Sequence, residues 1–192
     1  AAVVMVYINA VNGLINAFHP VLALANGLSL SQIGILSSIR SLASSWVRLG
    51  SGVLFRWLDA DRLTTPLIVL GTAAVVIVPA VAWSFWLQIP IFVAVGLARG
   101  LLRVSGSAMA FDAARQSQGA GGATNGAAGM TSAIIQSGLD IGKLAGPVLA
   151  GLVAQLAGVA QTFVILPVAL ALVYSLVRIA LAPRRAAGSR LG

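Results

Sequence analysis

The chain alternates between long apolar stretches and short joints, and this pattern gives six segments that are each long enough to cross a membrane. A spanning helix needs about 20 mostly apolar residues, each rising about 1.5 Å. The segments lie at about 3–24, 31–57, 66–84, 89–111, 125–157 and 161–181. We therefore predict an all-α integral membrane protein, with a bundle of six transmembrane helices over 1–183 and a basic tail over 184–192.

Charged residues collect in alternate joints of this pattern. The joints at 26–30, 86–88 and 157–160 carry no charge. The remaining joints and the tail carry Arg56, Asp59, Asp61, Arg62, Asp112, Arg115, Arg184, Arg185 and Arg190. Because basic loops stay on the cytoplasmic side, we expect these joints and both ends of the bundle to be cytoplasmic. We expect Trp83, Trp86 and Tyr7 to be aromatic anchors at the membrane interface.

The composition supports a lipid environment over a soluble one. Of the 192 residues, 59% are hydrophobic and 8% are charged, against about 45–50% and 25% in soluble domains. The chain has no cysteine, four acids and one histidine. This excludes disulfides and thiolate sites, and it argues against a metal centre or a bound cofactor. The basic residues that give the net charge of +8 are spread among apolar helices, which favours the bilayer over nucleic acid as a partner. We expect a multi-pass protein of a bacterial inner membrane.

Three asparagines and a histidine form one polar stripe on the first segment. Asn9, Asn12, Asn16 and His19 are spaced three, four and three residues apart, so a helix places all four on one face. Because unpaired amides are costly in lipid, this face should look onto a cavity or another helix. We interpret the asparagines as substrate-binding residues, with hydrogen bonding between helices as the alternative. His19 is a candidate for proton coupling, with a hydrogen-bonded structural role as its alternative.

Arginines occur at membrane depth in the second and fourth segments. Arg40 lies roughly 14 Å from the outer end of its helix, whereas Arg48 is far enough inward to extend to the cytoplasmic surface. Arg99 and Arg103 share a helix face four residues apart. They repel each other, so they need an anionic partner: Asp140, an acid elsewhere in the protein, or an anionic substrate. We assign Arg40, Arg99 and Arg103 to substrate binding.

The fifth segment carries the polar residues Gln136, Asp140 and Lys143 at spacings of four and three. Asp140 and Lys143 can pair within the helix. The pair is either structural, or it opens when a substrate or a proton arrives. In the second case Asp140 is the candidate for proton coupling, and Lys143 joins the substrate-binding residues.

Small residues recur on the same segment. Gly138, Gly142 and Gly146 fall at every fourth position, a spacing that permits close helix contact. Pro147 follows them and removes one backbone hydrogen bond, which favours a kink. We predict that this helix packs tightly and bends.

Several motifs resemble the major facilitator superfamily of transporters. The residues Phe18-His19-Pro20-Val21-Leu22, followed by Gly27-Leu28-Ser29 and Ile33-Gly34, are similar to the first hairpin of either half of that fold. Gly142 to Pro147 resembles the glycine–proline element of its fifth or eleventh helix, and Phe111-Asp112 resembles the acid that closes its fourth or tenth helix.

A degenerate copy of the cytoplasmic loop signature of that family adds to the resemblance. It runs from Arg48 through Gly52 to Asp61 and Arg62, with Arg56 where the family has an acid. The resemblance implies a gating role for Arg48, Gly52, Asp61 and Arg62. It also implies that the chain is one six-helix half, built of two inverted three-helix repeats. The degenerate loop and the basic tail favour the C-terminal half, and because the chain starts inside an apolar stretch, we expect a fragment of a longer protein.

We therefore expect a secondary transporter that works by alternating access on a small anionic or carboxylate-bearing solute, with proton coupling, and not an enzyme. The expected partners are the lipid bilayer, the other six-helix half and the solute. The alternative is a membrane subunit or assembly factor that keeps this fold without transporting. An intramembrane hydrolase is disfavoured because Ser51 lacks the expected glycine spacing, and a channel because no loop dips between the helices.

Overall fold

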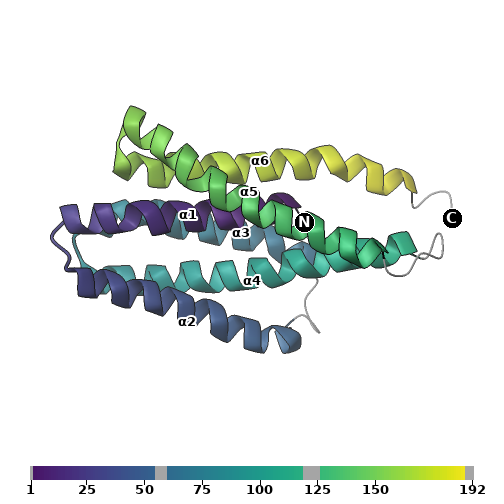
Figure 1. Cartoon of the computed structure of the whole chain (residues 1–192), viewed down its shortest axis with the longest axis horizontal. Helices are drawn as coiled ribbons and strands as arrows, with labels where there is room; N and C mark the ends of the chain where they lie inside the picture. The colour runs from purple at the N-terminus through teal and green to yellow at the C-terminus, as the bar shows by residue number, and fades with distance from the viewer. Residues whose placement is uncertain (1, 55–59, 119–125, 189–192) are drawn as a thin grey trace.

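The computed structural model of the chain describes residues 2–54, 60–118 and 126–188, and within these ranges it contains helices and turns but no strand. The helices are α1 (Ala2–Ala25), α2 (Leu30–Leu54), α3 (Ala60–Ile77), α4 (Phe85–Gln118), α5 (Gly126–Ala157) and α6 (Val159–Gly188), with a 3-10 turn, η1 (Val78–Val81), after α3. Figure 1 shows them as one elongated bundle in which successive helices run in opposite directions. The prediction of an all-α protein is confirmed.

Five helices of the described ranges are long and apolar enough to cross a membrane. They are Ala2–Ala25, Leu63–Val81, Phe85–Ala110, Gln136–Ala157 and Val159–Ala180. The sixth expected span, α2, has 25 residues and extends about 37 Å. Its serines and its two arginines, Arg40 and Arg48, interrupt its apolar sequence, and it is not among the five apolar spans. The structure therefore supports a multi-pass membrane protein, while the crossing of α2 stays a prediction.

The charge-free joints are tight turns with identifiable sequence causes. Gly27 has φ of 87° and Gly158 has φ of 93°, a left-handed backbone that glycine adopts without a Cβ clash at the end of a helix. At the start of α2 the Ser29 hydroxyl accepts a hydrogen bond from the Gln32 amide, and the Gln32 side chain accepts one from the Ser29 amide. This reciprocal capping satisfies two of the amides that a helix start leaves without partners.

The three charge-free turns lie together at one end of the bundle. In Figure 1 they are on the left, whereas the C-terminal ends of α2, α4 and α6 point to the right. The C-terminal ends of α1, α3 and α5 point to the left. The alternation of charged and uncharged joints in the sequence thus corresponds to the two ends of the bundle.

Several helix boundaries differ from the sequence-based expectation. α3 begins six residues before Pro66, which therefore lies inside the helix rather than in its first turn. α4 begins at Phe85, so the expected joint at 86–88 is helical, and α6 continues to Gly188 into the expected tail. The reason is physical. An apolar run in the sequence marks only the part of a helix that lies in the hydrocarbon layer. The helix itself continues beyond that run, because its backbone hydrogen bonds also form in the polar interface.

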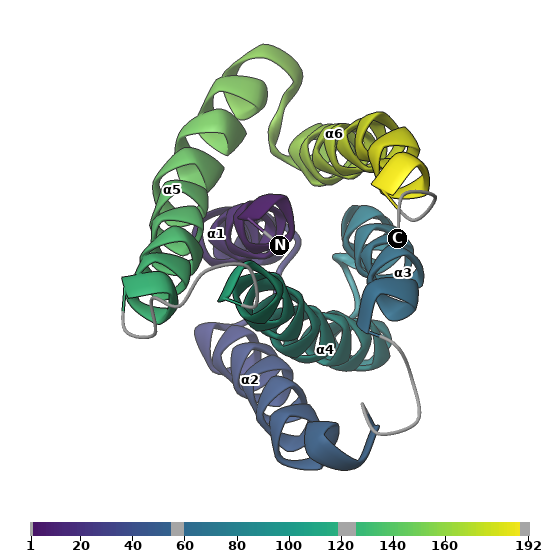
Figure 2. The ribbon, with the colours of Figure 1, turned by 90° about the vertical axis from the view of Figure 1, so that its right-hand side faces the viewer.

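The six helices form two consecutive triplets, α1–α3 and α4–α6, and the first helix of each triplet packs on the second helix of the other. α5 packs chiefly against α1, and α2 packs chiefly against α4. α3 packs on α4, α6 packs on α5 and α1, and α3 and α6 also touch each other. Figure 2 shows α5 and α2 flanking the α1 and α4 pair, with α3 and α6 on the other side of that pair. The two closest contacts are therefore equivalent: if α1–α3 are matched in order to α4–α6, the α1 and α5 contact corresponds to the α4 and α2 contact.

Both of these close contacts depend on glycines. A Cβ on Gly142 would lie 2.7 Å from the Val6 carbonyl oxygen, and one on Gly146 would lie 2.7 Å from Ala10 Cα. Gly138 lies on the same face, and Pro147 packs against Gly13 of α1. On the other side, a Cβ on Gly96 of α4 would lie 2.9 Å from Ala43 Cβ, and one on Gly100 would lie 2.8 Å from the Ser44 carbonyl oxygen of α2.

Candidate functional site

Four arginines from α2 and α4 form one group, which we name the arginine cluster: Arg40, Arg48, Arg99 and Arg103. Arg99 lies within electrostatic reach of the other three. The close glycine contact of α4 on α2 brings them together, because Gly96 and Gly100 lie on either side of Arg99 in sequence and pack against the α2 backbone at Arg40 and Ser44. Like charges so close in a low-dielectric region repel strongly, and the cluster therefore attracts an anion.

Arg40 is the most deeply buried member of the cluster. Its side chain is 3% exposed. One of its nitrogens, Nη2, donates a hydrogen bond to Asn16 Oδ1 of α1. Its Nε and Nη1 atoms are buried without a hydrogen-bond partner among the described residues. A buried guanidinium with a single acceptor is energetically unfavourable unless something else neutralises it.

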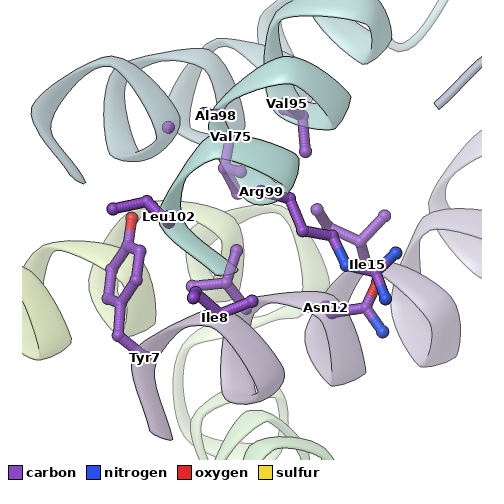
Figure 3. Close-up of a pocket in the computed structure, with 11 residues that line it drawn as sticks. Tyr7, Ile8, Asn12, Ile15, Val75, Val95, Ala98, Arg99 and Leu102 are labelled. Carbon is purple, nitrogen blue, oxygen red and sulfur yellow. The ribbon is translucent and has the colours of Figure 1, made fainter. Parts of the chain in front are cut away.

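Arg99 points into a pocket between α1, α3 and α4. Figure 3 shows the Arg99 side chain and the Asn12 side chain directed toward one another there. The remaining lining is mainly apolar, and it includes Tyr7, Val75 and Leu102. Asn12 Oδ1 has no hydrogen-bond partner among the described residues. The pocket thus combines one cation with one unused amide group in an apolar wall, which is the composition of a small-molecule subsite.

The asparagine stripe of α1 divides among three neighbours. Asn16 binds Arg40, Asn12 faces Arg99, and Asn9 is 5% exposed with its Cβ beside Gly142 of α5. Asn9 Nδ2 has no hydrogen-bond partner in the part of the chain that the structure describes. The structure therefore brings Asn12 and Asn16 to the arginine cluster, whereas Asn9 lies in the α1 and α5 contact.

Asp140 is not the partner of Arg99 and Arg103, which corrects one of the options that the sequence left open. Its Oδ1 pairs with Lys143 Nζ at 3.1 Å, and the Gln136 amide donates to both of its oxygens at 3.1 Å. The side chains of Asp140 and Lys143 are 53% and 60% exposed. The spacing along α5 explains this, because residues three and four apart meet on one helix face. The pair is local and neutral, and Asp140 therefore does not neutralise Arg40, Arg99 or Arg103.

His19 occupies a structural position at the charge-free end. It is 3% exposed, its Nε2 lies 2.7 Å from Gln88 Oε1, and its ring lies 4.5 Å from the ring of Phe92. The Gln88 amide nitrogen donates to the Ala82 carbonyl oxygen, so its oxygen faces His19 and the histidine Nε2 carries the proton. This arrangement ties α1 to the start of α4, and it is the hydrogen-bonded alternative given for His19.

The residues expected to form the gating loop are only partly described. Arg48 is exposed at the inner part of α2 and donates to the Ser44 carbonyl and the Ser45 hydroxyl. Gly52 lies in α2, and Asp61 and Arg62 lie in α3. The side chains of Asp61 and Arg62, and residues 55–59, fall outside the described part of the chain. Their gating role stays a prediction.

Sequence reasoning missed several functional and packing residues. The Gly96 and Gly100 spacing was visible in the sequence, and it marks the contact that assembles the arginine cluster. Tyr7 is not an interface anchor: it is 3% exposed, and its hydroxyl lies 2.7 Å from Thr72 Oγ1. A cluster of Thr65, Tyr174 and Arg178 joins α3 to α6. No spacing within one helix signals such contacts between helices.

The two pockets beside Arg99 and Arg40 are too small to enclose an organic solute. The pocket at Arg99 has a volume of about 20 Å³, and a second pocket at Arg40 has about 50 Å³. These volumes hold about one and about three water molecules. No protein-family model matches the chain, and no curated protein and no solved structure gives a significant match.

Proposed function

We propose that this chain is one six-helix half of a secondary transporter of the major facilitator type, and that it binds a small anionic or carboxylate-bearing solute at the arginine cluster. The observation that carries the proposal is the cluster itself. Arg40, Arg99 and Arg103 project from two helices near the middle of the bundle, and no described acid pairs with them. Cations at membrane depth are costly, and they are typically found where they meet a substrate or a pathway for ions.

The crosswise packing of the two triplets supports the transporter fold. Two three-helix repeats related by a pseudo-two-fold axis make equivalent contacts with each other, and the packing of α5 on α1 is equivalent in this sense to that of α2 on α4. A second six-helix unit would then cover the polar sides of α1, α2, α4 and α5. In the proposed orientation the ends of α2, α4 and α6 face the cytoplasm of a bacterial cell.

Asp140 is the proposed proton-coupling residue. It is the one acid at membrane depth in the described part of the chain, and it holds Lys143 by an ion pair. Protonation would release Lys143 to attract the solute. Asp140→Asn in the complete protein should abolish the dependence of uptake on a pH gradient while exchange of solute across the membrane continues. Gradient-driven uptake at the wild-type rate in Asp140→Asn would rule out this role.

The solute site is tested with the complete polypeptide in liposomes and detergent. A panel of mono- and dicarboxylates and organic phosphates is screened for thermal stabilisation, and compounds that stabilise are measured for uptake. Arg99→Ala and Arg103→Ala should each weaken binding by about tenfold or more, because each removes a charge-assisted contact. Arg184→Ala serves as the control, since it removes one positive charge outside the cluster.

Unchanged binding and uptake in both cluster variants would contradict the anion site. The alternative of a non-transporting subunit or assembly factor makes a different prediction. In that case a second chain co-purifies in a fixed ratio and no compound of the panel stabilises the protein.

A further inference from the structure

A second, separate pocket lies beside Arg40, between α1, α2 and α4. Its lining includes Asn16, His19, Ser37, Arg40 and Phe92. It shares only Ile15 with the pocket at Arg99. Its volume is about 50 Å³, which is room for about three waters and too little for an organic acid. A ligand of this size is distinct from an organic solute held at Arg99 and Arg103, while Arg40 contributes its charge to both sites.

Three of the polar side chains that line this pocket, those of Arg40, Asn16 and Ser37, carry hydrogen-bond donors. Arg40 has buried Nε and Nη1 atoms without partners among the described residues. Asn16 has committed its carbonyl oxygen to Arg40 Nη2, so its amide nitrogen remains to donate. Ser37 contributes a hydroxyl that donates as readily as it accepts. The His19 Nε2 proton is committed to Gln88.

The charge of Arg40 also requires compensation. It lies within electrostatic reach of Arg99, which adds repulsion. Water satisfies donors but leaves this positive charge in place, whereas an anion satisfies the donors and neutralises the charge.

We propose that this pocket binds a small inorganic anion of halide size, such as chloride, through Arg40, Asn16 and Ser37. The anion holds α2 to α1, two helices that touch each other little elsewhere. The proposal concerns a site distinct from the arginine pair Arg99 and Arg103, and it holds whether or not the chain transports a solute.

The test compares the thermal unfolding of the purified full-length protein in sodium chloride and in sodium gluconate at equal concentration. Gluconate is too large for the pocket. Chloride should raise the Tm by about 2–4 °C relative to gluconate, in a saturable manner, and bromide should act in the same way. Ser37→Ala should weaken the apparent chloride affinity by about tenfold, since it removes one hydrogen bond to an ion.

Two variants decide whether the effect belongs to this pocket. Arg40→Met keeps the length of the side chain and removes every donor, so the chloride effect should vanish. Arg103→Gln removes a cation of the cluster that lies outside the pocket, so the effect should persist. A wild-type Tm that is the same in chloride and gluconate, or a chloride effect that survives in Arg40→Met, would overturn the proposal.

A second measurement does not depend on the folding of Arg40→Met. The ³⁵Cl resonance of chloride should broaden in the presence of the wild-type protein, and added bromide should reverse the broadening. The same broadening should occur with Arg103→Gln, while no excess broadening with the wild type would refute the site. If solutes of the screening panel fail to bind while chloride does, the proposed transport function fails and this site stands.

Discussion

The two close helix contacts of the bundle use the same packing device but differ in their electrostatics. In the α1 and α5 contact, Gly142 and Gly146 of α5 receive the backbone of α1. In the α2 and α4 contact, Gly96 and Gly100 of α4 receive the backbone of α2. Glycines spaced by four allow two helices to approach closely. In lipid this close packing stabilises the contact, because no hydrophobic effect drives helices together there.

The charged residues next to these glycines differ in whether an acid neutralises them. Lys143 follows Gly142 directly, and it is neutralised by Asp140 one turn away on an exposed face. Arg99 lies between Gly96 and Gly100, and it faces Arg40 across the contact without a described acid nearby. The charge at the α1 and α5 contact is thus neutralised, whereas the α2 and α4 contact brings like charges together. Tight packing alone does not indicate which contact binds a ligand.

The largest effect should come from filling the glycine positions. Gly96→Ala should lower the free energy of unfolding by about 2–3 kcal/mol, because the new methyl group would meet the α2 backbone and separate the helices. Gly146→Ala should cost about the same if the two contacts are equivalent in packing. The measurement is unfolding in mixed micelles.

Gly34→Ala is the control for this pair. It changes a helical glycine that has nothing within 4 Å of its Cβ position, so it should raise stability by about 0.5–1 kcal/mol through helix propensity. Equal effects at Gly34 and Gly96 would mean that the α2 and α4 contact is looser than the structure has it.

A smaller loss of stability should distinguish the buried hydrogen bond at Arg40 from the exposed hydrogen bonds at Asp140. Asn16→Ala removes the acceptor of Arg40 and should cost about 1.5 kcal/mol or more, the value of a hydrogen bond to a buried charge. Gln136→Ala removes the amide that donates to Asp140 on an exposed face, and it should leave the Tm unchanged. Matching losses in the two variants would remove the distinction between a buried charge and a neutral exposed pair.

The smallest effect has the opposite sign. Arg40→Met should raise stability by about 1 kcal/mol in chloride-free gluconate, because replacing an uncompensated buried cation with an apolar side chain relieves its desolvation. Lys143→Met, at the corresponding exposed position, should not stabilise the protein. A loss of stability in Arg40→Met under these conditions would show that Arg40 is already neutralised by the protein.

The sequence predicted those features that depend on one helix at a time. The apolar runs gave the helices and the charge-free joints gave the ends at which they turn, while Asp140 and Lys143 were paired by spacing alone. It did not predict that Asn16 binds Arg40 or that Gly96 rests on α2, because these contacts depend on which helices become neighbours. The prediction that Tyr7 anchors the membrane interface is wrong, because its hydroxyl bonds to Thr72, 65 residues away, and a pattern within one helix does not reveal such a contact.

The low apolarity of α2 has a consequence for how the protein is made. An arginine at the centre of a helix opposes its transfer into lipid by about 2.5–3.5 kcal/mol, and α2 carries Arg40 and a row of serines. Its principal packing partner, α4, is synthesised only after α3. If α2 crosses the membrane as proposed, it lacks this partner during that interval. We expect α2 to settle in the bilayer only when α4 arrives with Gly96 and Gly100.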